Sequence, residues 1–277
     1  MDLSCGPKTL DLTAPVVMGV LNVTPDSFSD GGRFVELRAA VDQARMMVDE
    51  GAAIIDVGGE STRPGAAPVE TQEELRRVLP VIEHVARLPV IVSVDTSKPA
   101  VMRAAASAGA TLINDVRALA EEGALEAAAD TGCGVCLMHM QGEPRTMQKE
   151  PRYGDVVGDI KAFLEARVQS CVAAGIPNKR IAIDPGFGFG KTAAHNLELL
   201  RRLPELTSGS QPVLVGLSRK SLVGTILGRS AGDRLHGSLA LAAVAVLHGA
   251  RIVRAHDVGA TVDAVKAAHA VRTGGLT

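Results

Sequence analysis

The stretch "VVMGVLNVTPDSFSDGG", Val16 to Gly32, changes character at its middle. The first seven residues predict a buried strand, because the run is apolar until it ends at Asn22. Eight of the next ten residues are Thr, Pro, Asp, Ser or Gly, a composition typical of a loop and not of a strand. A single Asn at a strand end is commonly a turn residue. Whether Asn22 does more than turn the chain therefore depends on how the other strands end.

Seven more short runs rich in Val and Ile follow, and each predicts a strand. They lie at residues 53–59, 90–95, 111–116, 134–139, 180–186, 212–218 and 251–257. The runs are almost continuously apolar, as expected of parallel strands that are covered on both faces. Amphipathic helical patterns separate them, so strand and helix alternate eight times. This alternation predicts an α/β fold, a (β/α)8 TIM barrel, with a doubly wound sheet as the alternative.

The helical patterns carry start and stop signals of their own. Gly51 is expected to end the first helix, and Thr71 is expected to cap the second. Pro99 stands near the start of the third helix, which we expect to stop at Gly109. The apolar run Gly237–Ala250 is too short to cross a bilayer and predicts a buried helix.

Length and composition limit the classes of protein to which the chain can belong. The 277 residues contain no linker or shift in composition, so we expect a single domain over residues 1–277. The net charge of −2 and the scarcity of aromatic residues argue against nucleic-acid and membrane partners. Four cysteines are too few for a disulfide framework, and the N-terminal residues lack the pattern of a signal peptide. Both features predict a cytoplasmic protein with reduced thiols.

The predicted strands end on polar residues throughout the chain. These residues are Asn22, Glu60 just past its strand, Asp95, Asn114 with Asp115, His139, Asp184, Ser218, and Arg254 with His256. In a parallel barrel the carboxyl ends of all strands open to one mouth, where side chains are typically functional. A turn or cap explains any one of these residues, but the whole series predicts a polar site at the mouth.

The residue types at the predicted mouth suit two kinds of ligand. The acids Asp95 and Asp184 stand with the amides Asn22 and Asn114, and a carboxylate can accept two parallel N–H groups, such as those on the edge of a 2-amino-pyrimidinone ring. Cations beside Ser and Thr hydroxyls suit an anion such as a phosphate. The cationic cluster consists of Arg63, Arg219, Lys220, Arg254 and His256. We therefore expect the site to bind one polar ring and one anionic group.

Two other motifs are weaker signals. The stretch "DPGFGFGKT", residues 184–192, looks like a phosphate-binding loop, but it fits neither the Walker A spacing nor the dinucleotide fingerprint. Its glycines allow close approach of a ligand, and a plain Gly-rich turn is the alternative. The stretch "CGVC", residues 133–136, has no second cysteine pair to complete a zinc ribbon. We therefore expect Cys133 and Cys136 to pack in the core.

Eight stretches, in order along the chain, resemble the dihydropteroate synthases. They are "MGVLNVTPDSFSDGG", "DVGGESTRPGA", "VDTSKPAV", "INDVRAL", "LMHMQGEPRTMQ", "DPGFGFGKT", "GLSRKS" and "RAHDV". The resemblance extends from about residue 16 to residue 265. It implies a TIM barrel, usually a homodimer with Mg²⁺, that condenses 6-hydroxymethyl-7,8-dihydropterin diphosphate with 4-aminobenzoate. The products would be 7,8-dihydropteroate and pyrophosphate, in the step of folate synthesis that sulfonamides block.

The resemblance also implies roles for individual residues. The pterin-binding residues would be Asp95, Asn114, Asp184 and Lys220, with Met138 lining the ring. The Mg²⁺ ligand would be Asn22, and the residues facing the diphosphate would be Arg63, Arg254 and His256. The 4-aminobenzoate pocket would comprise Thr62, Pro64, Phe189, Lys220 and Ser221. The catalytic residues would be Asn22, Arg63, Asp95, Lys220, Arg254 and His256, and the loops 23–33 and 61–69 would close over the substrates.

The chain departs from the family pattern at two positions. Ala255 stands where a β-branched residue is usual, and we expect its side chain to point away from the ligand. Arg117 stands where many members have Ser, and no role is assigned to it. In the expected mechanism, the bond to diphosphate breaks early and the aromatic amine attacks a pterin methylene cation, so that no strong base is required.

Two related functions remain alternatives at this point. A methyltransferase that uses methyltetrahydrofolate shares the barrel and the pterin site, but it does not require the cations of "SRKS" and "RAHD". A non-catalytic paralogue that only binds pterin could have lost Asn22, Lys220 or Arg254, all of which are present.

Overall fold

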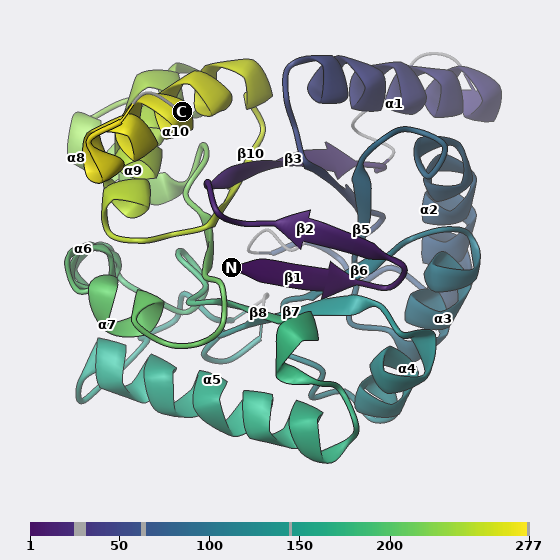
Figure 1. Cartoon of the computed structure of the whole chain (residues 1–277), viewed down its shortest axis with the longest axis horizontal. Helices are drawn as coiled ribbons and strands as arrows, with labels where there is room; N and C mark the ends of the chain where they lie inside the picture. The colour runs from purple at the N-terminus through teal and green to yellow at the C-terminus, as the bar shows by residue number, and fades with distance from the viewer. Residues whose placement is uncertain (25–31, 62–64, 144–145, 276–277) are drawn as a thin grey trace.

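The eight expected strands all form, and they surround a central axis in chain order (Figure 1). The computed structural model of the chain describes residues 1–24, 32–61, 65–143 and 146–275, with the side chains of the first helix described from residue 36. The strands are β3 (Val16–Asn22), β4 (Ile54–Gly58), β5 (Ile91–Asp95), β6 (Leu112–Asp115), β7 (Gly134–Met138), β8 (Ile181–Asp184), β9 (Leu214–Gly216) and β10 (Ile252–Ala255).

The strand order establishes a closed barrel. Neighbours follow the order β8-β7-β6-β5-β4-β3-β10-β9, and every pair is parallel. Ile183 of β8 also pairs in parallel with Val213, the residue before β9, which joins the two edges. The fold is therefore the predicted (β/α)8 barrel, and the doubly wound sheet is excluded because such a sheet keeps two open edges and a reversal of strand order.

Helices cover the outside of the barrel between successive strands (Figure 1). They are α1 (Gly32–Asp49), α2 (Thr71–Val85), α3 (Pro99–Ser107), α4 (Ala124–Thr131), α5 (Val156–Ala173), α6 (Ala193–Arg201), α7 (Pro204–Thr207), α8 (Ser221–Leu227), α9 (Leu235–Leu247) and α10 (Val258–Thr273). Short 3-10 turns lie at Asn178–Arg180 and Ala231–Asp233.

Most of the predicted helix signals are confirmed, and one is wrong. Gly51 follows α1 with a φ of +100°, which a residue with a side chain rarely adopts, and Pro99 is the first residue of α3. Thr71 was expected to cap α2, but it is already helical, and the cap position belongs to Glu70. The reason is that the chain enters the helix one residue earlier, where the Glu70 carbonyl accepts a hydrogen bond from the Glu74 N–H group.

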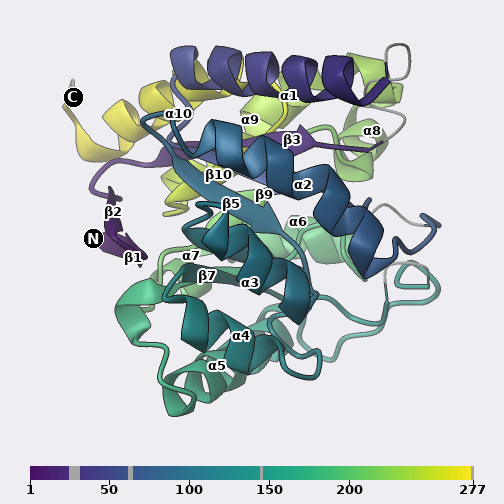
Figure 2. The same cartoon turned by 90° about the vertical axis from the view of Figure 1, so that its right-hand side faces the viewer.

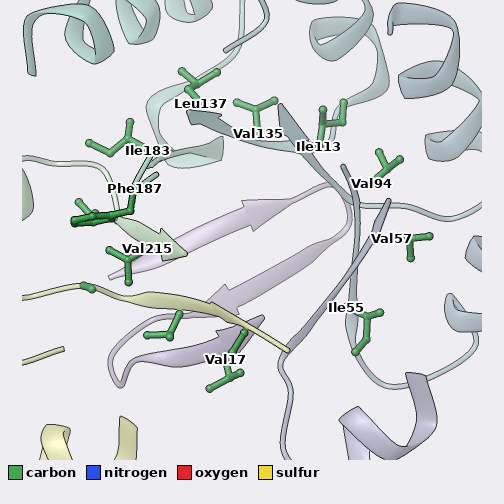
Figure 3. Packing of buried hydrophobic residues seen from close by; sticks show 14 of the residues in the cluster. Val17, Ile55, Val57, Val94, Ile113, Val135, Leu137, Ile183, Phe187 and Val215 are labelled. Carbon is green, nitrogen blue, oxygen red and sulfur yellow. The ribbon is translucent and has the colours of Figure 1, made fainter. Parts of the chain in front are cut away.

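The two sides of each strand carry different parts of the core. Side chains alternate across a strand, so every second residue faces the helices. Figure 3 shows this outer set around the ring of strands; it includes Val17, Ile55, Val57, Val94, Ile113, Val135, Leu137, Ile183 and Val215. The residues between them face the barrel axis, and near its base they form a second buried cluster that includes Met18, Ile54, Ile91, Leu112, Ala182 and Ile252.

An N-terminal hairpin closes the base of the barrel. Strands β1 (Asp2–Cys5) and β2 (Lys8–Asp11) pair antiparallel, and Figures 1 and 2 show them lying across one end of the barrel. Leu3 and Leu12 are fully buried there, in the same cluster as the base of the barrel interior. The sequence did not lead us to expect this hairpin. It leaves the opposite end, where the strands finish, as the open mouth.

The prediction of a buried helix at Gly237–Ala250 is only half right. On α9, Ser238, Ala242, Ala245 and Val246 are buried, but the exposed fraction is 36% for Val244 and 43% for Leu247. A helix on the outside of a barrel buries only the side that faces the strands. Packing against the barrel therefore does not explain why the outer side of α9 is apolar. None of the helices in the described ranges is both long and apolar enough to span a membrane.

Candidate active site

Five charged or polar side chains project into the barrel above its apolar base. Asp56, Asn114 and Arg254 lie two residues beyond Ile54, Leu112 and Ile252, and so point in the same inward direction. The other two are Asp95 and Asp184, at the ends of their strands. The three acids and the amide of this set are at most 9% exposed. The predicted polar mouth therefore exists, and it extends downward into the barrel.

Arg254 links the two acids on one side of this set. Its Nε donates to Asp56 Oδ2 at 2.7 Å, and its Nη2 donates to Asp95 Oδ2 at 2.9 Å. Burial alone would lower the pKa of Arg254, but the two carboxylates raise it above its usual range. The guanidinium is therefore a permanent positive charge that is held in place across the barrel from β10 to β4 and β5.

Asp56 is a site residue that the sequence reasoning missed. It is fully buried, and its Oδ2 also accepts a hydrogen bond from Asn114 Nδ2 at 3.0 Å. Its Oδ1 has no hydrogen-bond partner among the described residues. Asp56 thus orients Asn114 and Arg254 together. The signal that could have found it is an aspartate inside an otherwise apolar strand, two residues after an inward-facing Ile54.

Asp95 is a carboxyl whose ionisation falls near neutrality. Burial raises its pKa to about 7, Arg254 opposes the rise, and the negative charge of Asp56 adds to it. The two carboxylates share one guanidinium, so the proton balance of the pair depends on all three groups. A ligand that presents N–H donors would favour the ionised form of Asp95.

Asp184 and Lys220 form the other side of the site. Asp184 Oδ1 accepts the N–H of Gly186 at 2.7 Å, and burial raises the pKa of Asp184 while the charge of Lys220 opposes the rise. Loss of water around Lys220 lowers its pKa to about 8, and Asp184 opposes this change. The Lys220 ammonium donates to the carbonyl of Phe187 and lies 4.7 Å from the centre of the Phe189 ring.

The remaining predicted residues that the structure describes lie around the rim. Met138 ends β7 and is paired in register with Asp184. Gly58 keeps a space open beside Asn22, because a Cβ there would lie 3.9 Å from Asn22 Oδ1 and 3.7 Å from Asp95 Oδ2. The Nδ1 atom of His256 lies 3.1 Å from Ser218 Oγ. Ser221 follows Lys220 as the first residue of α8 and is exposed.

Some predicted residues do not join this cluster. Arg219 turns outward to bind Asp257, and Asp115 accepts hydrogen bonds from Ser97 and from the N–H groups of Arg117 and Leu119. Asp115 thus holds the loop after β6 and is not a mouth residue. Thr62, Arg63 and Pro64 lie outside the described residues, as does most of the predicted loop 23–33. In the parts of the chain that are described, no group of three or more His, Cys, Asp or Glu residues is arranged to hold a metal ion.

Two smaller expectations are confirmed. Ala255 is buried in the outer core, so its side chain points away from the mouth. Cys133 and Cys136 are free and buried, and burial raises the pKa of both thiols, as expected of packing residues and not of a redox pair.

Known proteins of one family resemble this chain over almost its whole length. Residues 18–256 match the family described as pterin binding enzymes. The dihydropteroate synthase of Escherichia coli K12 is 54% identical over 98% of this chain and 96% of its own length. Dihydropteroate synthase structures also superpose closely. A Yersinia pestis structure with a sulfonamide drug has a TM-score of 0.94 at 54% identity and covers 99% of this chain and all of its own. A Xanthomonas albilineans structure with 7,8-dihydropteroate has a TM-score of 0.89 at 47% identity and covers 98% of this chain and 99% of its own.

Proposed function

Because the chain belongs to the dihydropteroate synthases, it condenses 6-hydroxymethyl-7,8-dihydropterin diphosphate with 4-aminobenzoate, and we propose that the barrel mouth divides this reaction among a pterin site, an anion site and an aminobenzoate site. The products are 7,8-dihydropteroate and pyrophosphate. One observation carries the proposal: Arg254 donates to Asp95, and the charges of Lys220 and Arg254 both act on the buried Asp184, so two acids and two cations lie together at the mouth. A polar ring and its departing anion require this combination of charges side by side.

The pterin site consists of Asp95, Asn114, Asp184 and Lys220. The two carboxylates accept N–H groups of the ring, and the amide of Asn114 is oriented for its own contact by Asp56. Met138 lines the ring from the end of β7. All of these groups except Lys220 stand on strands, so the ring binds to the most rigid part of the protein.

The anion site consists of Arg254 and His256, with Arg63 as the proposed third cation. Arg254 is fixed by Asp56 and Asp95, and His256 by Ser218. Negative charge grows on the leaving diphosphate as its bond to the pterin methylene carbon breaks. Donors that are already in place stabilise this charge without rearranging during the reaction.

Mg²⁺ is proposed to bind together with the diphosphate at Asn22. The amide oxygen of Asn22 and the carboxylate of Asp95 border the space that Gly58 leaves open, which suits an ion that prefers oxygen ligands. Mg²⁺ commonly takes only one or two protein ligands beside substrate phosphates and water, so a single amide is sufficient. When bound, the ion supplies charge neutralisation for the diphosphate.

The chemical step needs no strong base. The C–O bond breaks, its electron pair leaves with pyrophosphate, and the nitrogen of 4-aminobenzoate forms the new C–N bond. The nitrogen then gives up a proton, which the released pyrophosphate or water accepts. An aromatic amine is unprotonated at neutral pH and attacks directly. Asp95 and Asp184 disperse the positive charge of the pterin methylene group. Phe189, Lys220 and Ser221 would line the proposed aminobenzoate site, to which the family resemblance also assigns Thr62 and Pro64.

A homodimer in the cytoplasm is the proposed state of the enzyme. Large exposed apolar side chains lie on neighbouring helices α8, α9 and α10, and a second copy would cover them (Figure 1). They are Ile226, Leu227, Val244, Leu247 and Val271. Four free and buried cysteines are consistent with a reducing compartment.

Pyrophosphate release tests the proposed function directly. Protein mixed with both substrates is expected to release pyrophosphate, whereas a non-catalytic paralogue would bind pterin and release none. Lys220→Ala and Arg254→Ala each remove a charge-assisted contact of about 1.5–3 kcal/mol, and we expect kcat/KM to fall about 10- to 100-fold. Lys179→Ala, at an exposed residue, is the matched control. Near-normal activity of both site variants would contradict the assigned roles.

A further inference from the structure

The connection between β8 and α6 is held by side chains at every carbonyl from Gly186 to Gly190. The carbonyls of Gly186 and Phe189 accept from Lys191 Nζ, each at 2.9 Å. The carbonyl of Gly190 accepts from Tyr153 Oη at 2.7 Å. The carbonyls of Phe187 and Gly188 accept from Lys220 and Gln148. A Gly-rich stretch, which would otherwise sample many conformations, is therefore fixed in one of them.

Lys191 is the side chain that contributes most to this arrangement. It is only 3% exposed, and its ammonium also lies 3.0 Å from His139 Nδ1 and 3.4 Å from the His139 carbonyl. Its hydrogen-bond partners are carbonyls and an imidazole, and within the described part of the chain it forms no ion pair. His139 can accept at Nδ1 only when neutral, and burial together with the charge of Lys191 lowers its pKa to about 3.

Two glycines bring the same stretch against the β7 connection. Gly186 and Gly190 have φ values of +70° and +60°. A Cβ at Gly186 would lie 1.9 Å from the His139 carbonyl oxygen, and one at Gly190 would lie 2.3 Å from the Gln141 carbonyl oxygen. No side chain fits at either place, so the backbone segments touch. The Lys191 ammonium spans this contact, because it binds carbonyls on both sides of it.

We propose that Lys191 is a positioning residue for the aminobenzoate side of the site, acting through the carbonyls of Gly186 and Phe189. Phe189 carries the ring that faces Lys220, and Phe187, between the two held carbonyls, binds the Lys220 ammonium. On the pterin side, Asp95 and Asn114 stand on strands that Lys191 does not touch, whereas Asp184 accepts the N–H of Gly186 and Lys220 is shared by both sides. This inference rests on the proposed function, because it assigns the wall built by Phe189 to 4-aminobenzoate.

The test is a comparison of the two substrates in variants of Lys191. Lys191→Met keeps the length of the side chain and removes its donors, and Lys191→Gln keeps a shorter donor. In Lys191→Met we expect the KM for 4-aminobenzoate to rise at least 10-fold. The affinity for the pterin diphosphate, measured by calorimetry, should fall by a clearly smaller factor, because Asp95 and Asn114 keep their contacts while Asp184 and Lys220 lose part of theirs. Lys191→Gln is expected to lie between Lys191→Met and the wild type. Lys179→Ala serves as the surface control.

The outcomes separate this proposal from the reaction itself. Equal losses for both substrates would assign Lys191 a general role in folding and overturn the proposal, and so would an unchanged KM for 4-aminobenzoate. If Lys191→Met does not fold, the same comparison in Lys191→Gln decides. A wild-type protein that releases no pyrophosphate would instead refute the proposed function, whatever the variants do.

Discussion

Asp56 and Asp95 share the guanidinium of Arg254, and this sharing determines how the site responds to pH. In the proposed pterin site only the ionised carboxylate of Asp95 would accept N–H groups at both oxygens, and burial raises the pKa of Asp95 to about 7. Activity is therefore expected to fall as the pH drops through this value, because the proton that binds Asp95 occupies an acceptor. The carboxylate of Asp56 is one cause of the raised pKa.

Asp56→Asn tests this arrangement at the residue scale. The substitution removes a negative charge beside Asp95 and leaves Arg254 to pair with Asp95 alone, and both changes lower the pKa of Asp95. We expect the acid limb of the pH profile of kcat/KM to move to lower pH. We also expect its plateau to fall about 10-fold or more, because Arg254 and Asn114 then share a neutral amide oxygen in place of a charged carboxylate. Asp263→Asn, on the exposed side of α10, is the control, and an acid limb that stays in place would contradict the coupling.

The sequence predicted the residues that end strands and missed those that lie deeper. Asp95, Asn114, Asp184 and Arg254 were predicted because each stands where an apolar run gives way to polar residues. Asp56 was missed because apolar residues flank it on both sides, and only the strand's inward direction shows its role. Lys191 was overlooked because it lies in a stretch that fits no phosphate-loop motif. The carbonyl groups that accept its hydrogen bonds come from backbone segments whose positions the sequence does not predict.

At the scale of elements, strands and helices followed from periodicity, but the N-terminal hairpin did not. Its two strands have four residues each, and their pairing depends on the base of the barrel as much as on their own turn. The alternation of Leu3 with Cys5 and of Leu10 with Leu12, around the turn at Gly6 and Pro7, was the available signal. The hairpin closes the base of the barrel, which is the end opposite the site.

Leu3→Ala tests this role of the hairpin. Leu3 is fully buried in the cluster at the barrel base, so its truncation leaves a cavity, and we expect the free energy of unfolding to fall by about 2–5 kcal/mol. The kcat at a temperature where the variant is folded should stay close to that of the wild type, because the site lies at the other end. Urea-induced unfolding measures the first quantity. Met46→Ala, at a residue of α1 that is 53% exposed, should change it by less than about 0.5 kcal/mol.

At the scale of the whole molecule, the barrel places the apolar residues that stabilise the fold and the polar residues of the site in different regions. Its outer face and base are filled by apolar residues, whereas the carboxyl ends of the strands collect groups that are up to 198 positions apart in the chain, as in the pair of Arg254 with Asp56. No local pattern reports such a pair. The sequence could predict it only through the repeated alternation of strand and helix, which determines that all strand ends meet.

The outer sides of α8 and α9 carry apolar residues that belong neither to the core nor to the site at the mouth. Val244 and Leu247 are three residues apart on α9, so they lie on one side of the helix, and no described element covers them. If a second copy covers this side, two acidic residues there would place charges in an apolar interface. We therefore expect the double variant Val244→Asp, Leu247→Asp to sediment as a monomer and the wild type as a dimer.

The matched control for the dimer is Val172→Asp, which places the same charge on α5 at a residue 45% exposed. This variant should sediment as the wild type does. Each barrel holds its own Asp95, Asp184, Lys220 and Arg254, so a monomeric variant should still bind the pterin diphosphate, which calorimetry can measure. A wild type that sediments as a monomer, or a double variant that remains a dimer, would contradict the proposed dimer interface on α9.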